Sequence, residues 1–233
     1  MKVVSLCYDG GGWTFPYLAG ITKTVVNHPK LKRNVNFKFA GSSSGACVAL
    51  AAALDVPMDL LFKESIKYIN LVRFFPMLTV LAVKQLALKF LKDRPDVLRQ
   101  LEEPKLAINV TKMQYGVIPR KHIIYKFNNK THIVKTAMNT CAVPLINSFA
   151  LFRRSYDGAL TSRFFTLPWK SDLVIKLSSC KVRRDADFCL QAKHIPLYRT
   201  IIPYNHQGME FLFKQGETDG KAVVAWIIDK LEI

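Results

Sequence analysis

The sequence contains cysteines, but their number and spacing are not those of a disulfide-rich protein or of a zinc site. The five cysteines are Cys7, Cys47, Cys141, Cys180 and Cys189. Their number is odd and no two form a C-x-x-C pair, which argues against a disulfide framework and against a zinc site. We therefore expect a chain that works in a reducing compartment and holds no metal.

A linker is also missing. No stretch rich in Pro, Gly or Ser divides the chain, and it contains no internal repeat or low-complexity tract. The 233 residues, half of them hydrophobic, are enough for one large domain. We expect residues 1–233 to form a single domain with one main core.

Acidic residues are scarce. The chain has 17 Asp and Glu against 34 Lys and Arg, a formal net charge of +17. No carboxylate occurs between Asp9 and Asp55, and Asp157 is alone between Glu103 and Asp172. Such a charge favours anionic partners, namely phospholipid surfaces, nucleic acid or acidic proteins. Because no helix-turn-helix, zinc-finger or RNP-like pattern is present, we expect no nucleic-acid partner.

Long uncharged hydrophobic runs are absent. In the most apolar segment, residues 71–92, the longest uncharged run is residues 74–83, against the ~20 residues that span a bilayer. This segment is expected to be an interfacial or lid helix, with a plain core helix as the alternative. The N-terminus is too short and too soon acidic for a secretory signal. We expect a cytoplasmic, peripherally membrane-associated protein.

Short apolar runs alternate with amphipathic stretches along the chain. This alternation predicts an α/β fold with a mostly parallel or mixed sheet. The predicted strands are residues 3–7, 35–40, 106–111, 122–127 and 172–177. The predicted helices are residues 15–27, 46–54, 58–70, 94–102, 130–141 and 221–231, while 209–213 fits either a helix or a strand.

A G-x-S-x-G pentapeptide occupies residues 41–45, between a predicted strand and a predicted helix. In this context it indicates a nucleophile elbow, with Ser43 at the turn and the Ser44 amide opening the helix. A Ser/Gly loop that only caps a helix is the alternative. The small side chains of residues 46–53 favour the elbow, because they let the helix lie close to its strand.

Three glycines, Gly10, Gly11 and Gly12, follow Asp9 directly after the first predicted strand. Their amides could approach either a nucleotide phosphate or the oxyanion of an acyl-transfer intermediate. The dinucleotide pattern fails because Phe15 stands where its last glycine belongs, and no G-K-[ST] follows. An oxyanion hole fits better, with a tight turn that binds nothing as the alternative.

A catalytic serine needs a base. A Ser-His-Asp triad could use His194 or His206, but that fold places several strands before the elbow and here only one is predicted. The alternative base is Asp157, in the sequence Tyr156-Asp157-Gly158. Its ionised form would be favoured by Arg153 and Arg154 if they lie close in space.

The glycine loop, the elbow at residues 41–45 and residues 157–159 (Asp-Gly-Ala) occur in the order of a known family. Together they resemble the patatin-like phospholipases, which use a Ser-Asp dyad, over residues 2–178. Residues 137–144 are similar to the small-residue segment of that family. The adipose triglyceride lipase-like branch looks nearest, since Tyr17 and Gly20 also fit, whereas Phe15 and Pro16 depart from the pattern.

The resemblance implies a three-layer α/β/α sandwich with a central, mostly parallel or mixed sheet. It implies a lipid acyl hydrolase of phospholipase A or lipase type that uses no cofactor and no metal. Ser43 and Asp157 would be catalytic, with Gly10, Gly11 and Gly12 forming the oxyanion hole. The implied partners are a glycerolipid or phospholipid substrate and an anionic membrane or lipid-droplet surface. An acyltransferase on the same dyad and a non-catalytic lipid-binding protein remain alternatives.

Overall fold

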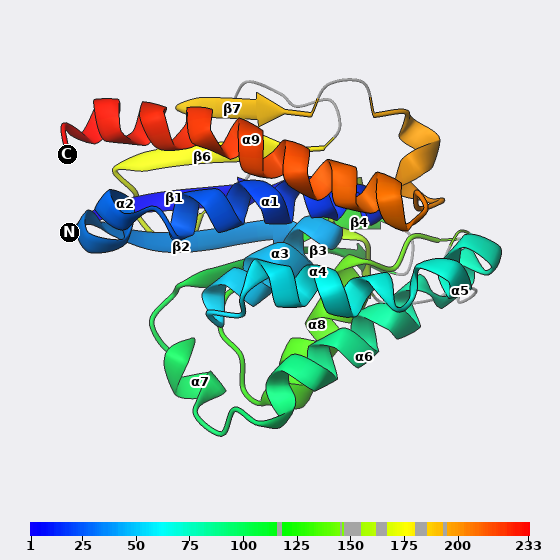
Figure 1. Ribbon diagram of the computed structural model, residues 1–233. Helices are drawn as coiled ribbons and strands as arrows, with labels where there is room; N and C mark the ends of the chain where they lie inside the picture. The colour runs from blue at the N-terminus through cyan, green and yellow to red at the C-terminus, as the bar shows by residue number, and fades with distance from the viewer. Residues whose placement is uncertain (116–117, 145, 147–154, 162–166, 180–185, 193–194) are drawn as a thin grey trace.

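A computed structural model describes residues 1–115, 118–144, 146, 155–161, 167–179, 186–192 and 195–233. At its centre lies a sheet whose strand order is β4-β3-β2-β1-β6-β7, with β5 paired to β3 (Figure 1). The strands are β1 (Lys2–Tyr8), β2 (Val35–Ser42), β3 (Leu106–Gln114), β4 (Ile118–Ile124), β5 (Ser155–Tyr156), β6 (Leu173–Ser178) and β7 (Phe188–Gln191). The predicted α/β class with a mixed sheet is confirmed.

Most of the strand pairs are parallel. β1 lies between β2 and β6, and the pairs β1–β2, β1–β6, β2–β3 and β6–β7 all run in the same direction. Only β4 and β5 pair antiparallel, both with β3. The carboxyl ends of β1 and β2 therefore meet at one edge of the sheet, which is where ligands bind in open α/β folds.

The helices pack on one face of this sheet. They are α1 (Phe15–Val26), α2 (Pro29–Asn34), α3 (Ser44–Ala53), α4 (Met58–Ile66), α5 (Ile69–Phe74), α6 (Thr79–Lys92), α7 (Val97–Gln100), α8 (Lys130–Thr140) and α9 (His206–Leu231). Each of them contributes buried side chains to one hydrophobic cluster, together with Val4, Leu6 and Tyr8 of β1. Short 3-10 turns, η1 to η4, cover residues 12–14, 76–78, 158–160 and 197–200.

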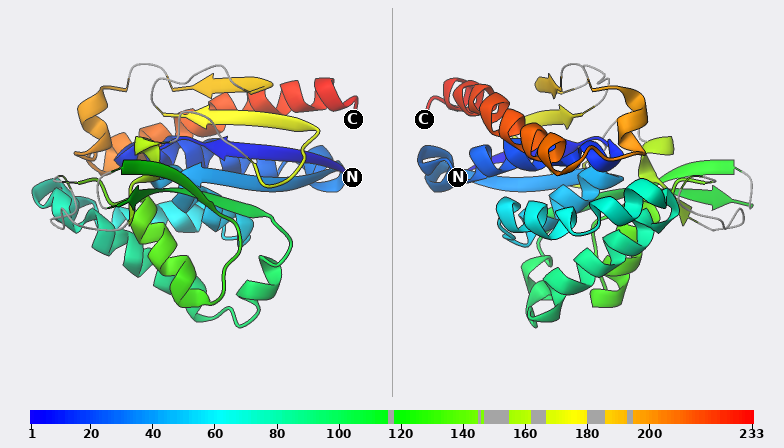
Figure 2. Two further views of the ribbon diagram at one scale, coloured as in Figure 1. Left: turned by 180° about the vertical axis from the view of Figure 1, so that it is seen from behind. Right: turned by 45° about the vertical axis from the view of Figure 1, so that its right-hand side comes forward.

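The opposite face of the sheet carries a much smaller cluster. Its buried members are Cys7, Ala40 and Ala107, and Leu167 and Trp169 pack against them. The indole of Trp169 donates a 2.8 Å hydrogen bond to Ser5 Oγ. Seen from behind, the strands lie in front of α1 and α9 (Figure 2, left). In the described part of the chain, no helix contributes to this smaller cluster.

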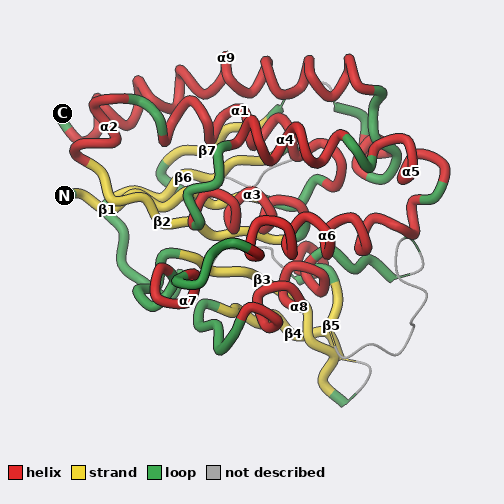
Figure 3. The backbone as a smooth tube through the Cα atoms, turned by 60° about the horizontal axis from the view of Figure 1, so that its bottom comes forward, coloured by secondary structure: helices red, strands yellow, loops and turns green. Residues whose placement is uncertain are grey.

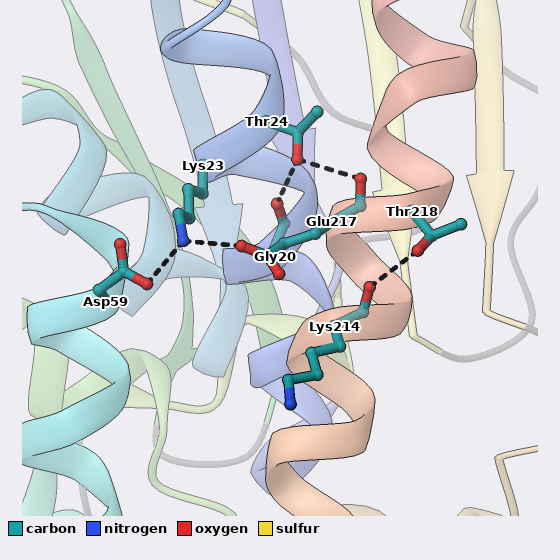
Figure 4. Close-up of polar contacts among 7 residues, drawn as sticks. All are labelled: Gly20, Lys23, Thr24, Asp59, Lys214, Glu217 and Thr218. Carbon is teal, nitrogen blue, oxygen red and sulfur yellow. Dashed lines mark hydrogen bonds and ion pairs between the residues drawn. The ribbon is translucent and has the colours of Figure 1, made fainter.

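Helices α1 and α9 run side by side over the sheet (Figures 1 and 3). A Cβ on Gly216 of α9 would overlap the carbonyl oxygen of Tyr17, so the helices touch through backbone. Figure 4 shows the polar contacts beside this crossing: Lys23 bridges Asp59 and Glu217, at 2.7 Å each. The packing of α9 thus fixes α1, the helix that follows the glycine loop.

The structure moves or divides several predicted elements. The helix predicted at residues 58–70 breaks into α4 and α5, and residues 209–213 belong to a helix that starts at His206. The strand predicted at residues 122–127 lies at residues 118–124 instead, because β4 is an edge strand that tolerates Pro119. Within residues 71–92, α6 is packed into the core, whereas Phe74, Phe75 and Met77 are exposed. No helix in the described ranges has the length and apolar character to cross a membrane.

Candidate active site

The turn between β2 and α3 holds Ser43 in a strained conformation. Its φ is 53° and its ψ is −135°, a backbone region that residues other than glycine rarely adopt. Two glycines make the sharp turn possible: a Cβ on Gly41 would lie 2.6 Å from the Ala46 amide, and one on Gly45 would lie 2.5 Å from the Asp9 carbonyl. The turn therefore presents the Ser43 side chain at the carboxyl edge of the sheet.

The structure brings Ser43 and Asp157 together. Ser43 Oγ donates a 2.7 Å hydrogen bond to Oδ2 of Asp157, although 114 positions separate the two residues. The other carboxylate oxygen, Oδ1, accepts from the Ala159 amide at 2.7 Å. Both side chains are nearly buried, with exposed fractions of 8% for Ser43 and 2% for Asp157. This geometry permits direct proton transfer from the hydroxyl to the carboxylate.

Burial raises the pKa of Asp157 from 3.8 to about 6. The hydrogen bonds from Ser43 and from the Ala159 amide act in the opposite direction but do not cancel the loss of solvation. The carboxylate is thus a stronger base than an exposed aspartate, and it is still mostly ionised near neutral pH. Arg153 and Arg154, predicted to favour the ionised form, lie outside the described residues.

Polar residues that the sequence analysis did not single out hold the dyad in place. The Ser43 amide donates to Thr140 Oγ1 at 2.8 Å, and that hydroxyl donates to the Asn109 carbonyl at 2.6 Å. Thr111 Oγ1 donates to the Asp157 carbonyl at 2.8 Å. The Asp157 amide donates to the carbonyl of Ala142 at 2.9 Å.

These contacts explain the small-residue segment noted in the sequence. Thr140 and Ala142 belong to residues 137–144, which the resemblance had already singled out. The glycine after the aspartate is explained as well, since a Cβ on Gly158 would overlap the Asn109 carbonyl. Nothing in the sequence marks Asn109 itself, a single polar residue inside an apolar strand.

The glycine loop after β1 lies directly against the elbow. A Cβ on Gly10 would lie 2.8 Å from Ser43 Cβ, and Gly12 has a φ of +53°. The Gly11 amide donates to Ser44 Oγ at 3.2 Å. Within the described part of the chain, the amides of Gly10 and Gly12 have no acceptor, so both can donate to a ligand.

The two histidines considered as bases are not found beside the serine. His206 is exposed at the start of α9 and hydrogen-bonds with neither Ser43 nor Asp157. His194 lies outside the described residues. In the described ranges, no group of three or more His, Cys, Asp or Glu side chains is placed to hold a metal ion.

A cavity of about 430 Å³ opens over the dyad. One end is lined by Ser43, Asp157 and the glycine loop, and the rest is mainly apolar, with walls that include Phe15 from α1 and Leu86 from α6. A second, smaller cavity of about 30 Å³ lies beside Cys47 between α3 and α6, and Cys47 and Leu86 line both cavities. This size and lining suit the apolar chain of a ligand whose polar group lies at the dyad.

Comparison with known proteins gives only distant structural similarities. The sequence matches no protein-family model and no curated protein. Among solved structures, the fold is similar to the type III effector ExoU (17% identity, 95% of this chain, TM-score 0.47). It is also similar to ExoU in the ExoU–SpcU complex from the type III secretion system of Pseudomonas aeruginosa (13%, 100%, 0.44) and to VipD from Legionella pneumophila (13%, 76%, 0.45). The chain spans about half the length of those proteins, 53%, 52% and 50% respectively.

Proposed function

We propose that this protein is a lipid acyl hydrolase of the patatin-like kind, which cleaves carboxylic esters of glycerolipids through an acyl-enzyme. One observation carries the proposal: the 2.7 Å hydrogen bond from Ser43 to Asp157 at a strained elbow that opens into an apolar cavity. As a finer part of this proposal, we assign the protein to the adipose triglyceride lipase-like branch, and this assignment rests on Tyr17 and Gly20 alone.

The reaction proceeds in two steps. Asp157 takes the Ser43 proton as Oγ attacks the ester carbonyl carbon, and the proton then passes to the departing alcohol. The amides of Gly10, Gly12 and Ser44 donate to the oxyanion, while Gly11 positions Ser44 through its hydrogen bond to Oγ. Water, activated by Asp157, attacks the acyl-enzyme and releases the fatty acid.

The substrate is a glycerolipid or phospholipid. The acyl chain lies in the apolar cavity between α1, α3 and α6, with the ester carbonyl over Ser43. Long acyl chains extend past Cys47 into the smaller cavity. Head-group contacts occur at the cavity mouth, outside the buried dyad.

The cavity mouth docks on an anionic phospholipid surface. Exposed apolar side chains from three parts of the chain surround it: Phe74, Phe75 and Met77 flank the cavity residue Pro76, and Leu160 and Ile201 line the cavity itself. Helix α5 and the turn after it project at one end of the molecule (Figure 1). The net charge of +17 attracts the protein to anionic lipid. Insertion of these apolar side chains then holds the cavity mouth at the bilayer.

Labelling with a fluorophosphonate probe tests the catalytic proposal. Wild-type protein should react at Ser43, and both Ser43→Ala and Asp157→Asn should lose the label. His206→Ala serves as the control and should keep most of it. Equal loss in His206→Ala would overturn the Ser-Asp assignment in favour of a triad.

Product analysis on phosphatidylcholine vesicles tests the reaction itself. Free fatty acid should be released, and the amount should not fall when a monoacylglycerol acceptor is added. Transfer of the acyl group to that acceptor would instead identify an acyltransferase. Labelled protein that turns over neither substrate would contradict the hydrolase proposal.

Vesicle co-sedimentation tests the membrane surface. The F74D/F75D variant should bind vesicles of phosphatidylcholine with phosphatidylserine about tenfold or more weakly than wild type, because two apolar side chains no longer insert. Leu60→Asp, on α4 and outside the cavity lining, is the matched control. Equal losses in the two variants, or binding that does not weaken with salt, would contradict the proposed docking face.

A further inference from the structure

Two cysteines from different helices meet at the wall of the cavity. Cys47 lies on α3, one turn after Ser43, and Cys141 directly follows α8. Their sulfur atoms are 3.7 Å apart, so they are in contact but not bonded. Both side chains line the cavity that holds the dyad, and Cys47 is partly exposed while Cys141 is buried.

Cys141 stands between two residues that hold the dyad. Thr140 accepts the hydrogen bond from the Ser43 amide, and Ala142 accepts the one from the Asp157 amide. Any displacement of Cys141 is therefore transmitted to the backbone of Ser43 and of Asp157. The contact with Cys47 and burial raise the pKa of the Cys141 thiol, and the nearby Asp157 carboxylate acts in the same direction.

We propose that Cys47 and Cys141 form a reversible disulfide under oxidation and that this bond switches off the adjacent dyad. A disulfide needs an S–S distance of about 2.0 Å, so the sulfurs must approach from 3.7 Å. This approach draws the end of α8 towards α3, and with it Thr140 and Ala142. The loss of activity rests on the proposed hydrolase function, whereas formation of the disulfide does not.

A hydroperoxide supplies the oxidising equivalents. Cys47 is the more exposed of the two, and its sulfur attacks the O–O bond, which yields a sulfenic acid and one water or alcohol. The Cys141 sulfur then displaces the hydroxyl, which leaves as water with the Cys141 thiol proton. In sum, two thiols are oxidised and one hydroperoxide is reduced. Thiol–disulfide exchange with dithiothreitol reverses the change.

The test treats the full reduced chain with hydrogen peroxide and measures two things. Peptide mapping without reduction should find a Cys47–Cys141 cross-link, with a mass lower by two hydrogen atoms. The rate of fluorophosphonate labelling should fall by about tenfold or more and recover with dithiothreitol, because a displacement of ~1 Å in a catalytic site can cost ~100-fold. Cys47→Ser should abolish both effects, and Cys189→Ser should abolish neither.

The two measurements separate this inference from the proposed function. The cross-link is read by mass and can be found even in a protein that does not label. A different pairing, or no cross-link while other cysteines oxidise, would overturn the inference. A cross-link that leaves labelling unchanged would overturn the switch. Cys47→Ser keeps the test valid if the buried Cys141→Ser variant does not fold.

Discussion

The Ser43 amide donates a 2.8 Å hydrogen bond to the hydroxyl of Thr140, 97 positions further along the chain. The same hydroxyl donates to the carbonyl of Asn109 on β3. The elbow is thus tied to the end of α8 and, through it, to the central sheet. This side chain is the only protein group that a described hydrogen bond joins to the Ser43 amide.

Thr140→Val tests the role of this contact. The two side chains have nearly the same shape, but valine leaves the buried amide of Ser43 without an acceptor, a loss of about 1–3 kcal/mol. We expect kcat for ester hydrolysis to fall about tenfold or more with little change in KM, because the nucleophile is displaced while the cavity is kept. Thr140→Ser should restore most of the activity. A change in KM alone would contradict a positioning role.

The pKa of Asp157 predicts the pH dependence of acylation. Only the ionised carboxylate can accept the Ser43 proton, and burial raises its pKa to about 6. The labelling rate should therefore rise about tenfold per pH unit below this value and level off above it. The rate of fluorophosphonate labelling, measured from pH 4.5 to 8.5 under conditions where the fold is intact, provides the profile. A plateau that extends down to pH ~4.5 would contradict a base whose pKa is raised to about 6.

Asp157→Asn should stabilise the fold while it removes activity. The pKa of this buried carboxyl is raised above its unfolded value, so the ionised group destabilises the folded state at neutral pH. This loss of folding free energy disappears as the pH falls below about 4, because the group is then protonated in both states. An amide of the same shape avoids it. We expect the free energy of unfolding at pH 7.5 to rise by about 1–3 kcal/mol, as measured by urea denaturation. At pH 4 the difference should vanish.

Leu86 offers a test of where the acyl chain lies. It lines both the main cavity and the smaller one beside Cys47, so Leu86→Trp should fill the space where the two adjoin. The ratio of kcat/KM for long-chain over short-chain esters should fall about tenfold. Leu88→Trp, on the same helix but lining neither of these cavities, should leave the ratio unchanged. Equal effects of the two variants would place the acyl chain elsewhere.

The crossing of α1 and α9 can be tested by adding one methyl group. In an exposed helix, Gly→Ala stabilises by about 1 kcal/mol. At Gly216 the added Cβ would overlap the Tyr17 carbonyl, so we expect destabilisation of about 2–4 kcal/mol in thermal or urea unfolding. Ala222→Val, on the exposed side of the same helix, should change the stability by less than about 0.5 kcal/mol. An increase in stability for Gly216→Ala would contradict the close packing.

The sequence was informative wherever a motif reflects a backbone requirement. Both the strands that carry the site and the elbow at residues 41–45 could be predicted, because they depend on apolar runs and glycine spacing within a short stretch of sequence. The juxtaposition of Ser43 and Asp157 was predicted from the order of the motifs. Their catalytic roles, and those of Gly10, Gly11 and Gly12, remain predictions, as does a single domain over residues 1–233.

The parts that sequence reasoning missed are those set by tertiary contacts. The helix α2 and the strands β5 and β7 are short, with six, two and four residues respectively, and have little periodicity to detect. Thr140 and Asn109 are single polar residues whose partners lie far away in the chain.

The contact between α1 and α9 joins residues 193 positions apart, as in the hydrogen bond from Thr24 to the Glu217 carbonyl. Such distant pairings form late, because the intervening chain must be available before the loop can close. During synthesis, the glycine loop and its helix therefore emerge from the ribosome long before their packing partner. A chain that still lacks α9 has no packing partner for α1, the helix that follows the glycine loop. We therefore expect this loop to take its final shape only after α9 has been synthesised and has packed against α1.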